Sequence, residues 1–327
     1  MNRLSAVVLL LACCASTAAA HHGVASPGMA GLEGPGAPLE TTSTATLPAG
    51  SWLGYAKLDR ADFTTDAALR DDEGDVSTFW MFGLGYGVTP WLSVYAFAPY
   101  QAKVAEDNSF NTAGFADPSV LAVAGFVWDG GLHRTPANES LDDMEDWHFS
   151  LWAGSSLPLG DADLADPDGA IDPGMSLGFG KPSLQSGLAV SKMFADRWTA
   201  VAEFSRIGFS EYEYDDGQKV RFGAEWRVGA ALCARLWSSA ASSTRLDLNL
   251  EGSLLRLGRD ESDGVGDLGT GGDILYALPG LRLTRGRASF GLGLKVPTWT
   301  DLNEDTTQQG AEGKESSRLL MTFSTLF

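Results

Sequence analysis

The stretch Thr78–Val88, with the sequence TFWMFGLGYGV, decides the fold because bulky apolar side chains alternate in it with glycine. Alternation of period two places successive side chains on opposite faces of a β-strand. One face of this strand is therefore bulky and apolar, and the other is nearly bare. The bulky face carries Trp80, Phe82, Leu84, Tyr86 and Val88, and the bare face carries Gly83, Gly85 and Gly87.

Similar alternation recurs on both sides of this stretch in segments of about ten residues, the length that a tilted strand needs to cross the hydrocarbon layer. After residue 20, no apolar run approaches the roughly 18 residues of a membrane helix, so a membrane protein built from this chain must be a barrel. We predict an all-β fold, an antiparallel up-and-down transmembrane β-barrel over residues 50–327. Its strands, about twelve in number, are expected at residues 51–59, 76–88, 91–102, 117–128, 147–158, 182–194, 197–207, 219–236, 244–256, 273–284, 288–298 and 316–327.

The predicted connections alternate in length. Links such as 89–90, 195–196 and 285–287 are brief, whereas 60–75, 103–116, 159–181, 208–218, 257–272 and 299–315 are long. Short periplasmic turns and long outer loops are typical of outer-membrane barrels. The link 129–146 departs from this pattern, because it is long and falls on the side of the short turns.

The N-terminus predicts export. Arg3, the apolar run Leu4–Ala12 and the small residues Ala18–Ala20 are typical of a cleaved secretory signal peptide over residues 1–20. A lipoprotein cleavage box at Leu10–Cys13 is the alternative. Residues 21–49 are rich in Gly, Pro, Ala and Thr, and we expect a flexible periplasmic lead or a segment inside the lumen. Cleavage would leave Cys233 without a disulfide partner in the chain.

The C-terminal strand predicts the location. Leu319, Met321, Phe323 and Phe327 share one face, so the chain ends on an outward aromatic residue. This C-terminal strand resembles the last strand of outer-membrane proteins, which their assembly machinery recognises. Phe323 and Phe327 are the predicted assembly signal. We expect a protein of the outer membrane of a Gram-negative bacterium. Its expected partners are outer-membrane lipid, lipopolysaccharide and the barrel-assembly machinery.

Charged side chains opposite the apolar face predict a lumen wall. Such a wall suits a water-filled or narrowly plugged channel. The alternative is that these charges pair across the wall and serve only to stabilise the barrel. The predicted lumen-lining residues are Glu203, Arg221, Glu225, Arg227, Arg245, Asp247 and Glu251, with the aromatics Tyr95 and Phe97. The formal net charge of -19 repels phosphate, so nucleic acid is not an expected partner.

Other chemistry has few supports in the sequence. His148-Phe149-Ser150 resembles the His-x-Ser of outer-membrane phospholipase, but the pair should face the lumen and no matching asparagine motif follows. We therefore predict no enzyme, no catalytic residue and no cofactor. His21 and His22, beside the predicted cleavage site, are a candidate Cu(II) site; a chance pair of histidines is the alternative. The acidic outer loops are interpreted as solvated loop surface.

A series of short motifs resembles the outer-membrane family named for the MetA pathway of phenol degradation. Their order along the mature chain carries the resemblance: TLPAGSW at 46–52, YGVTPW at 86–91, APY at 98–100, GFAD at 114–117, SLPLGD at 156–161 and SKMF at 191–194. The resemblance implies transport of small molecules across the outer membrane and supplies no catalytic residue. We expect a channel or transporter for a small-molecule solute, with aromatic or apolar compounds as the candidates. A non-conducting surface or metal-handling barrel is the alternative.

Overall fold

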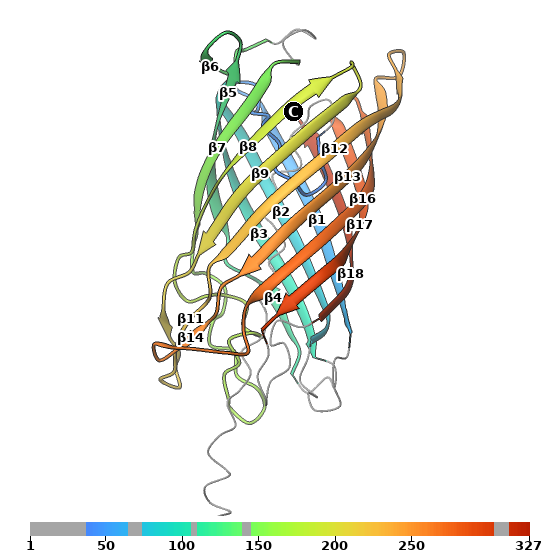
Figure 1. Cartoon of the computed structure of the whole chain (residues 1–327). Coiled ribbons are helices and arrows are strands. Elements are labelled where there is room, and N and C mark those ends of the chain that lie inside the picture. The colour runs from blue at the N-terminus through green and yellow to red at the C-terminus, as the bar shows by residue number, and fades with distance from the viewer. Residues whose placement is uncertain (1–36, 65–73, 106–109, 139–144, 304–313) are drawn as a thin grey trace, which may run out of the picture.

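The computed structural model describes residues 37–64, 74–105, 110–138, 145–303 and 314–327. Twelve antiparallel strands form a closed barrel in which each strand pairs with the next along the chain, and β1 pairs with β18 (Figure 1). The predicted fold class is therefore confirmed. The barrel strands are β1 (Trp52–Thr64), β2 (Gly74–Thr89), β3 (Leu92–Ala105), β5 (Ser119–Trp128), β7 (Trp147–Ser156), β8 (Leu184–Phe194), β9 (Trp198–Gly208), β12 (Glu225–Ser239), β13 (Thr244–Leu257), β16 (Gly272–Arg285), β17 (Ala288–Leu302) and β18 (Lys314–Leu326). No helix among the described residues is long and apolar enough to cross a membrane.

The apolar faces of the strands point outward. In β2, Phe82 and Leu84 are each 46% exposed, whereas Gly85 is buried on the inner face. The same outward pattern continues around the ring with residues such as Trp128, Leu151 and Phe323. Contiguous apolar surface of this extent is unfavourable in water and suits contact with lipid chains.

The inner face of β2 is bare because the next strand fills the space. A Cβ added at Gly83 would lie 2.7 Å from the Phe97 ring, and one added at Gly85 would lie 2.5 Å from the Tyr95 ring. Both rings come from β3 and stack with centroids 6.0 Å apart. The glycine face of Thr78–Val88 is therefore the complement of two inward aromatic side chains.

The two ends of the barrel differ in the length of their connections. Short turns join β2 to β3, β8 to β9 and β16 to β17 at the end that holds both Trp52 and Phe327. The long link 129–146 lies at this end and includes β6 (Leu132–Arg134), which pairs with residues 126–128 of β5. The departure from the predicted loop pattern is thus in part a hairpin that extends the wall.

One predicted strand, 219–236, is wrong at its start. The barrel strand β12 begins at Glu225, and residues 219–221 form β11 in a small separate sheet with β10 (Tyr212–Glu213), β14 (Glu261–Ser262) and β15 (Val265–Gly266). The chain joins the wall only after Gly223, where an added Cβ would lie 2.1 Å from the carbonyl oxygen of Gly258. A further short strand, β4 (Thr112–Phe115), pairs with β3.

Candidate functional site

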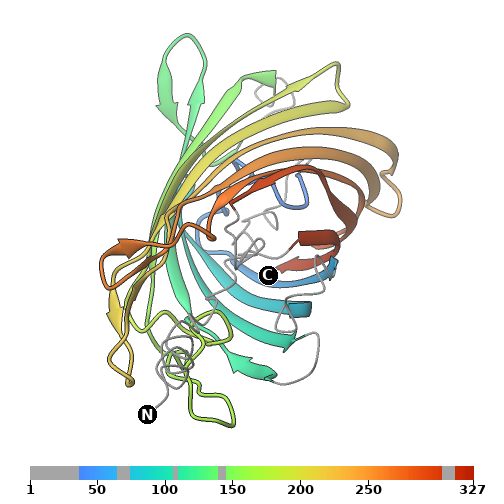
Figure 2. The same ribbon diagram turned by 60° about the horizontal axis from the view of Figure 1, so that its bottom comes forward.

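Residues 37–50, here named the arch, run inside the barrel (Figure 2). The carbonyl oxygen of Ala37 accepts hydrogen bonds from Arg282 and Asn249, and the Thr46 hydroxyl donates to the carbonyl of Pro90 in the β2–β3 turn. Between these points the arch reaches Glu251 and Glu203 on strands β13 and β9. The arch therefore spans the lumen from one side of the wall to the other.

Wall carboxylates bind the main chain of the arch. Glu251 accepts hydrogen bonds from the backbone amides of Leu39, Glu40 and Thr41, the last at 2.7 Å. Glu203 accepts one from the amide of Thr42 at 2.8 Å. Buried backbone amides need acceptors, and a segment without sheet partners must obtain them from side chains. These two carboxylates supply them.

Glu40 is the charged contact between the arch and the wall. Its Oε1 accepts hydrogen bonds from Arg227 on β12 and from Lys295 on β17, each at 2.9 Å. All three side chains are buried. A buried charge is tolerated when it is paired and hydrogen-bonded with good geometry, as Glu40 is here.

Leu39 fits a depression lined by glycine. Cβ atoms added at Gly280 and Gly291, on β16 and β17, would lie 2.2 Å and 2.4 Å from its methyl groups. Leu278 and Leu320 complete the contact. Two strands are therefore bare where the arch packs against them, and the wall is shaped for this segment.

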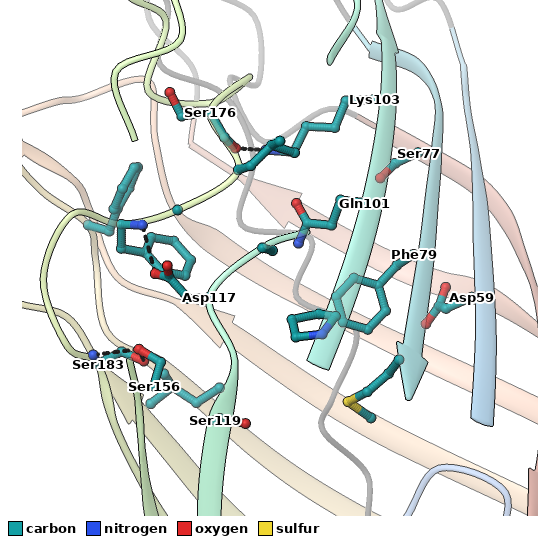
Figure 3. A pocket seen from close by; sticks show the side chains of 18 of the residues that line it. Asp59, Ser77, Phe79, Gln101, Lys103, Asp117, Ser119, Ser156, Ser176 and Ser183 are labelled. Atoms are coloured by element: carbon teal, nitrogen blue, oxygen red, sulfur yellow. Dashed lines mark hydrogen bonds between the residues drawn. The ribbon is translucent and has the colours of Figure 1, made fainter. Parts of the chain in front are cut away.

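A cavity of about 150 Å³ lies inside the barrel at the end with the long connections, several of which contribute to its lining (Figure 3). Its apolar lining includes Phe79, Met81, Pro99, Leu177 and Phe222, and polar groups of Gln101, Gln185 and Ser119 also face it. Apolar lining with a few polar groups is typical of sites for small molecules.

The connection 157–183 covers part of this cavity and is held by two charged side chains. Lys103 Nζ donates to the carbonyls of Gly174 and Ser176 at 2.6 Å and 2.7 Å (Figure 3). Asp117 accepts from the amides of Gly160 and Phe179. Burial raises the pKa of the Asp117 carboxyl, and these amide hydrogen bonds oppose that shift.

Buried charged side chains on the inner face beside the cavity pair with one another. Arg318 Nε donates to Glu315 at 2.8 Å, and Arg318 Nη1 lies 3.3 Å from Asp59. Lys57 lies 3.7 Å from the other Asp59 oxygen. Asp59 and Arg318 both line the cavity, so its charged groups are already paired within the protein.

Most of the predicted lumen residues are buried on the inner face. The structure brings Glu203, Arg227 and Glu251 together around the arch. Tyr95 and Phe97 pack with Leu47 of the arch in the core, and Arg245 pairs with Asp247 at 2.6 Å. The buried members of the predicted set are Tyr95, Phe97, Glu203, Glu225, Arg227, Asp247 and Glu251.

The prediction that Arg221 lines the lumen is wrong. This residue lies on β11, outside the barrel wall, and its Nη2 is 2.5 Å from a carboxylate oxygen of Glu261. Strict alternation through residues 219–236 placed it inside, but the chain joins the barrel wall only at Glu225, after Gly223.

Sequence reasoning missed four buried cations of the inner face, Lys57, Arg282, Lys295 and Arg318. Arg282 and Lys295 bind the arch, whereas Lys57 and Arg318 pair with Asp59 of the wall. Each lies at an inward position of a strand that alternates, and that pattern could have identified them. Glu40 had no comparable signal, because the arch has no period.

The remaining predicted residues have separate outcomes. Ser150 is buried beside the arch and lies 3.5 Å from the carbonyl of Ser43, while His148 Nδ1 contacts the carbonyl of Asp146. Phe323 and Phe327 are exposed on the outer face. The predicted signal peptide, residues 1–20, and His21 and His22 lie outside the described residues.

Comparison with known proteins yields similarity of structure only. No protein-family model and no curated protein matches the sequence. An outer membrane channel from Pseudomonas putida F1 is similar in fold, with a TM-score of 0.65 and 14% sequence identity over 87% of this chain and 98% of that chain. The β domain of the Bordetella autotransporter BrkA (TM-score 0.44, 10% identity, 85% and 99% covered) and a mutant of the monoaromatic hydrocarbon channel TodX (0.44, 11%, 86% and 91%) match less well. At these identities the comparisons show a barrel fold shared with outer-membrane proteins.

Proposed function

We propose that this protein is an outer-membrane channel or transporter for small solutes. The observation that carries the proposal is a solute-sized cavity inside a closed barrel whose outer surface is apolar. An apolar outer belt suits lipid, and a cavity within the wall suits a solute on its way through. The fold shared with the Pseudomonas putida channel supports the same proposal.

The solutes we propose are small, uncharged and mainly apolar, with aromatic compounds included. Phe79, Met81 and Phe222 offer apolar contact in the cavity. Lys103 and Asp117 are bound to backbone groups, and Arg318 is bound to acidic side chains. Because these charges already have partners, an ion entering the cavity would compete with existing pairs, whereas a neutral solute would not.

Location and partners follow from the same proposal. We infer export to the outer membrane by a cleaved signal peptide, with lipid and lipopolysaccharide around the apolar belt. The outward rings of Phe323 and Phe327 support recognition of the last strand by the barrel-assembly machinery. Membership of the family named for the MetA pathway of phenol degradation remains part of the proposal and rests on the motif order.

Uptake by liposomes containing the purified barrel tests the function. A small neutral aromatic solute should enter faster than into empty liposomes, and Leu177→Trp, which fills the cavity, should reduce entry. Leu268→Trp is the matched control, because Leu268 is 59% exposed and does not line the cavity. Entry equal to that of empty liposomes, with no current in planar bilayers, would refute the channel.

A non-conducting barrel is the second candidate, and the arch favours it because the arch lies in the lumen and Glu40 binds it to two strands of the wall. Deletion of residues 37–45 separates the two candidates. Solute entry that appears only in the deletion variant would mean that the intact chain is closed. For a metal-handling role, copper titration of the parent against the His21→Ala/His22→Ala variant is the test, and equal binding would exclude that terminal site.

A further inference from the structure

The contact between Glu40 and the wall has the geometry of a built anion site. The Arg227 guanidinium and the Lys295 ammonium come from different strands and converge on the same carboxylate oxygen, each at 2.9 Å. Both cations are at least nine-tenths buried. The Lys295 ammonium also lies 4.1 Å from the centroid of the Tyr276 ring, which fixes its position further.

The anion in this site belongs to a segment that is separate from the wall. The arch joins no sheet of the described structure, and side chains of the wall bind its main chain. We take the arch to move when the barrel conducts, because it lies inside the lumen. Its movement would remove Glu40 and leave Arg227 and Lys295 buried without their shared partner. The loss of a hydrogen-bonded partner from a buried charge is unfavourable.

The surroundings select the kind of anion. Glu203 and Glu251 lie close to the site, since they bind the arch at Thr42 and at Leu39–Thr41. Two nearby carboxylates disfavour an anion of higher charge. The site is thus suited to a single carboxylate, which Glu40 supplies in the closed barrel.

We propose that Arg227 and Lys295 form a carboxylate-binding site, that Glu40 occupies it while the arch is in place, and that small monocarboxylates compete with Glu40 for it. The competition with the arch rests on the proposed channel function; the site itself does not. A small monocarboxylate, acting beside the neutral solute, would favour the open barrel by replacing the partner that the arch withdraws.

Acetate binding to the refolded barrel in detergent tests the site. Glu40→Ala removes the CH₂COO⁻ part of the side chain, which acetate replaces. A tethered carboxylate competes at an effective concentration on the order of millimolar, so Glu40→Ala should bind acetate roughly tenfold more tightly than the parent. Acetamide, which has the same shape without the charge, should show no such gain by calorimetry. Adding Lys295→Met to Glu40→Ala should abolish the gain for acetate.

The matched control is Glu213→Ala. Glu213 pairs with Lys219 at 3.3 Å on the exposed small sheet, so its loss leaves a cation in water. An equal gain of acetate binding in Glu213→Ala, or an equal gain for acetamide in Glu40→Ala, would overturn the site. If Glu40→Ala does not fold, acetate present during refolding should restore the heat-modifiable folded form and acetamide should not; failure of this rescue would also overturn it. Binding is measured at equilibrium, so it can succeed where the liposome test of the proposed function fails.

Discussion

Trp52 and Phe327 exchange two backbone hydrogen bonds, at 2.8 Å and 2.9 Å, and so complete the pairing of β1 with β18 that closes the barrel. The Phe327 ring is 59% exposed on the outer face, and the Trp52 ring is also exposed. Closure removes the last free edge of the sheet, which in lipid would leave backbone groups unsatisfied.

Deletion of Phe327 should lower the fraction of chain that folds. The deletion removes both closing hydrogen bonds and the outward ring. Electrophoresis with and without heating measures the folded fraction. Phe327→Leu, which keeps the backbone and an apolar side chain, should retain most of it; equal folding of the deletion variant would contradict the role of the last residue in closure.

Lys295→Met should loosen the arch. The change removes one of the two donors to Glu40 in a buried site, and the loss of a hydrogen bond to a charged group costs roughly 1.5–3 kcal/mol. Hydrogen exchange at residues 39–42 should become faster. Lys219→Met, made at an exposed pair, is the control and should change exchange there very little. Slow exchange in both variants would show that the arch does not depend on this pair.

Gly291→Ala should displace Leu39. The new Cβ would lie 2.4 Å from a Leu39 methyl group and equally close to the Thr322 hydroxyl, which can rotate. Overpacking of this kind costs roughly 1–3 kcal/mol. Unfolding in denaturant measures the cost, and adding Leu39→Ala should recover part of it. Gly252→Ala meets its nearest atom at 3.5 Å and should be close to neutral.

Lys103→Met should release the connection 157–183 from the cavity. Two carbonyls, those of Gly174 and Ser176, would lose their donor, at a cost of roughly 1–3 kcal/mol for each group left buried. Limited proteolysis of the connection should become faster. The exposed Lys181 provides the control, and Lys181→Met should leave the cleavage rate unchanged. Equal rates in the two variants would mean that Lys103 does not hold this segment.

The outer loops should show an alkaline transition at Tyr212. The hydroxyl of Tyr212 donates to Asp163 at 2.6 Å, and this hydrogen bond is the main reason that its pKa rises from 10.0 to about 12. The raised value means that the contact stabilises the loops fully below pH 10.0 and is lost as pH rises through about 12. Ultraviolet titration of phenolate formation should give a lower pKa for Tyr212 in Asp163→Asn than in the parent. An unchanged titration curve would mean that the hydrogen bond to Asp163 does not raise this pKa.

The parts of the fold that could be predicted from the sequence are those with regular alternation of apolar and small or polar residues. Thr78–Val88 and the terminal strand could be assigned to faces because each side chain in a strand has one of two directions. Arg221 was misassigned because alternation continues across Gly223, whereas the barrel strand β12 begins only at Glu225 and Gly223 packs against the backbone of Gly258. Such a contact joins residues far apart in the sequence, so it has no local signal.

The sequence by itself determined the barrel: the periodic apolar face, the glycine face opposite it and the final Phe327 are all local patterns that follow from strand geometry. Only the tertiary structure decided what fills it. Glu40 and Lys295 are 255 residues apart, and the arch that carries Glu40 has no period of its own. The path of the arch is fixed because its buried amides and the buried Glu40 carboxylate need hydrogen-bond partners, which side chains of the wall supply. Those side chains lie close together only once the barrel has closed.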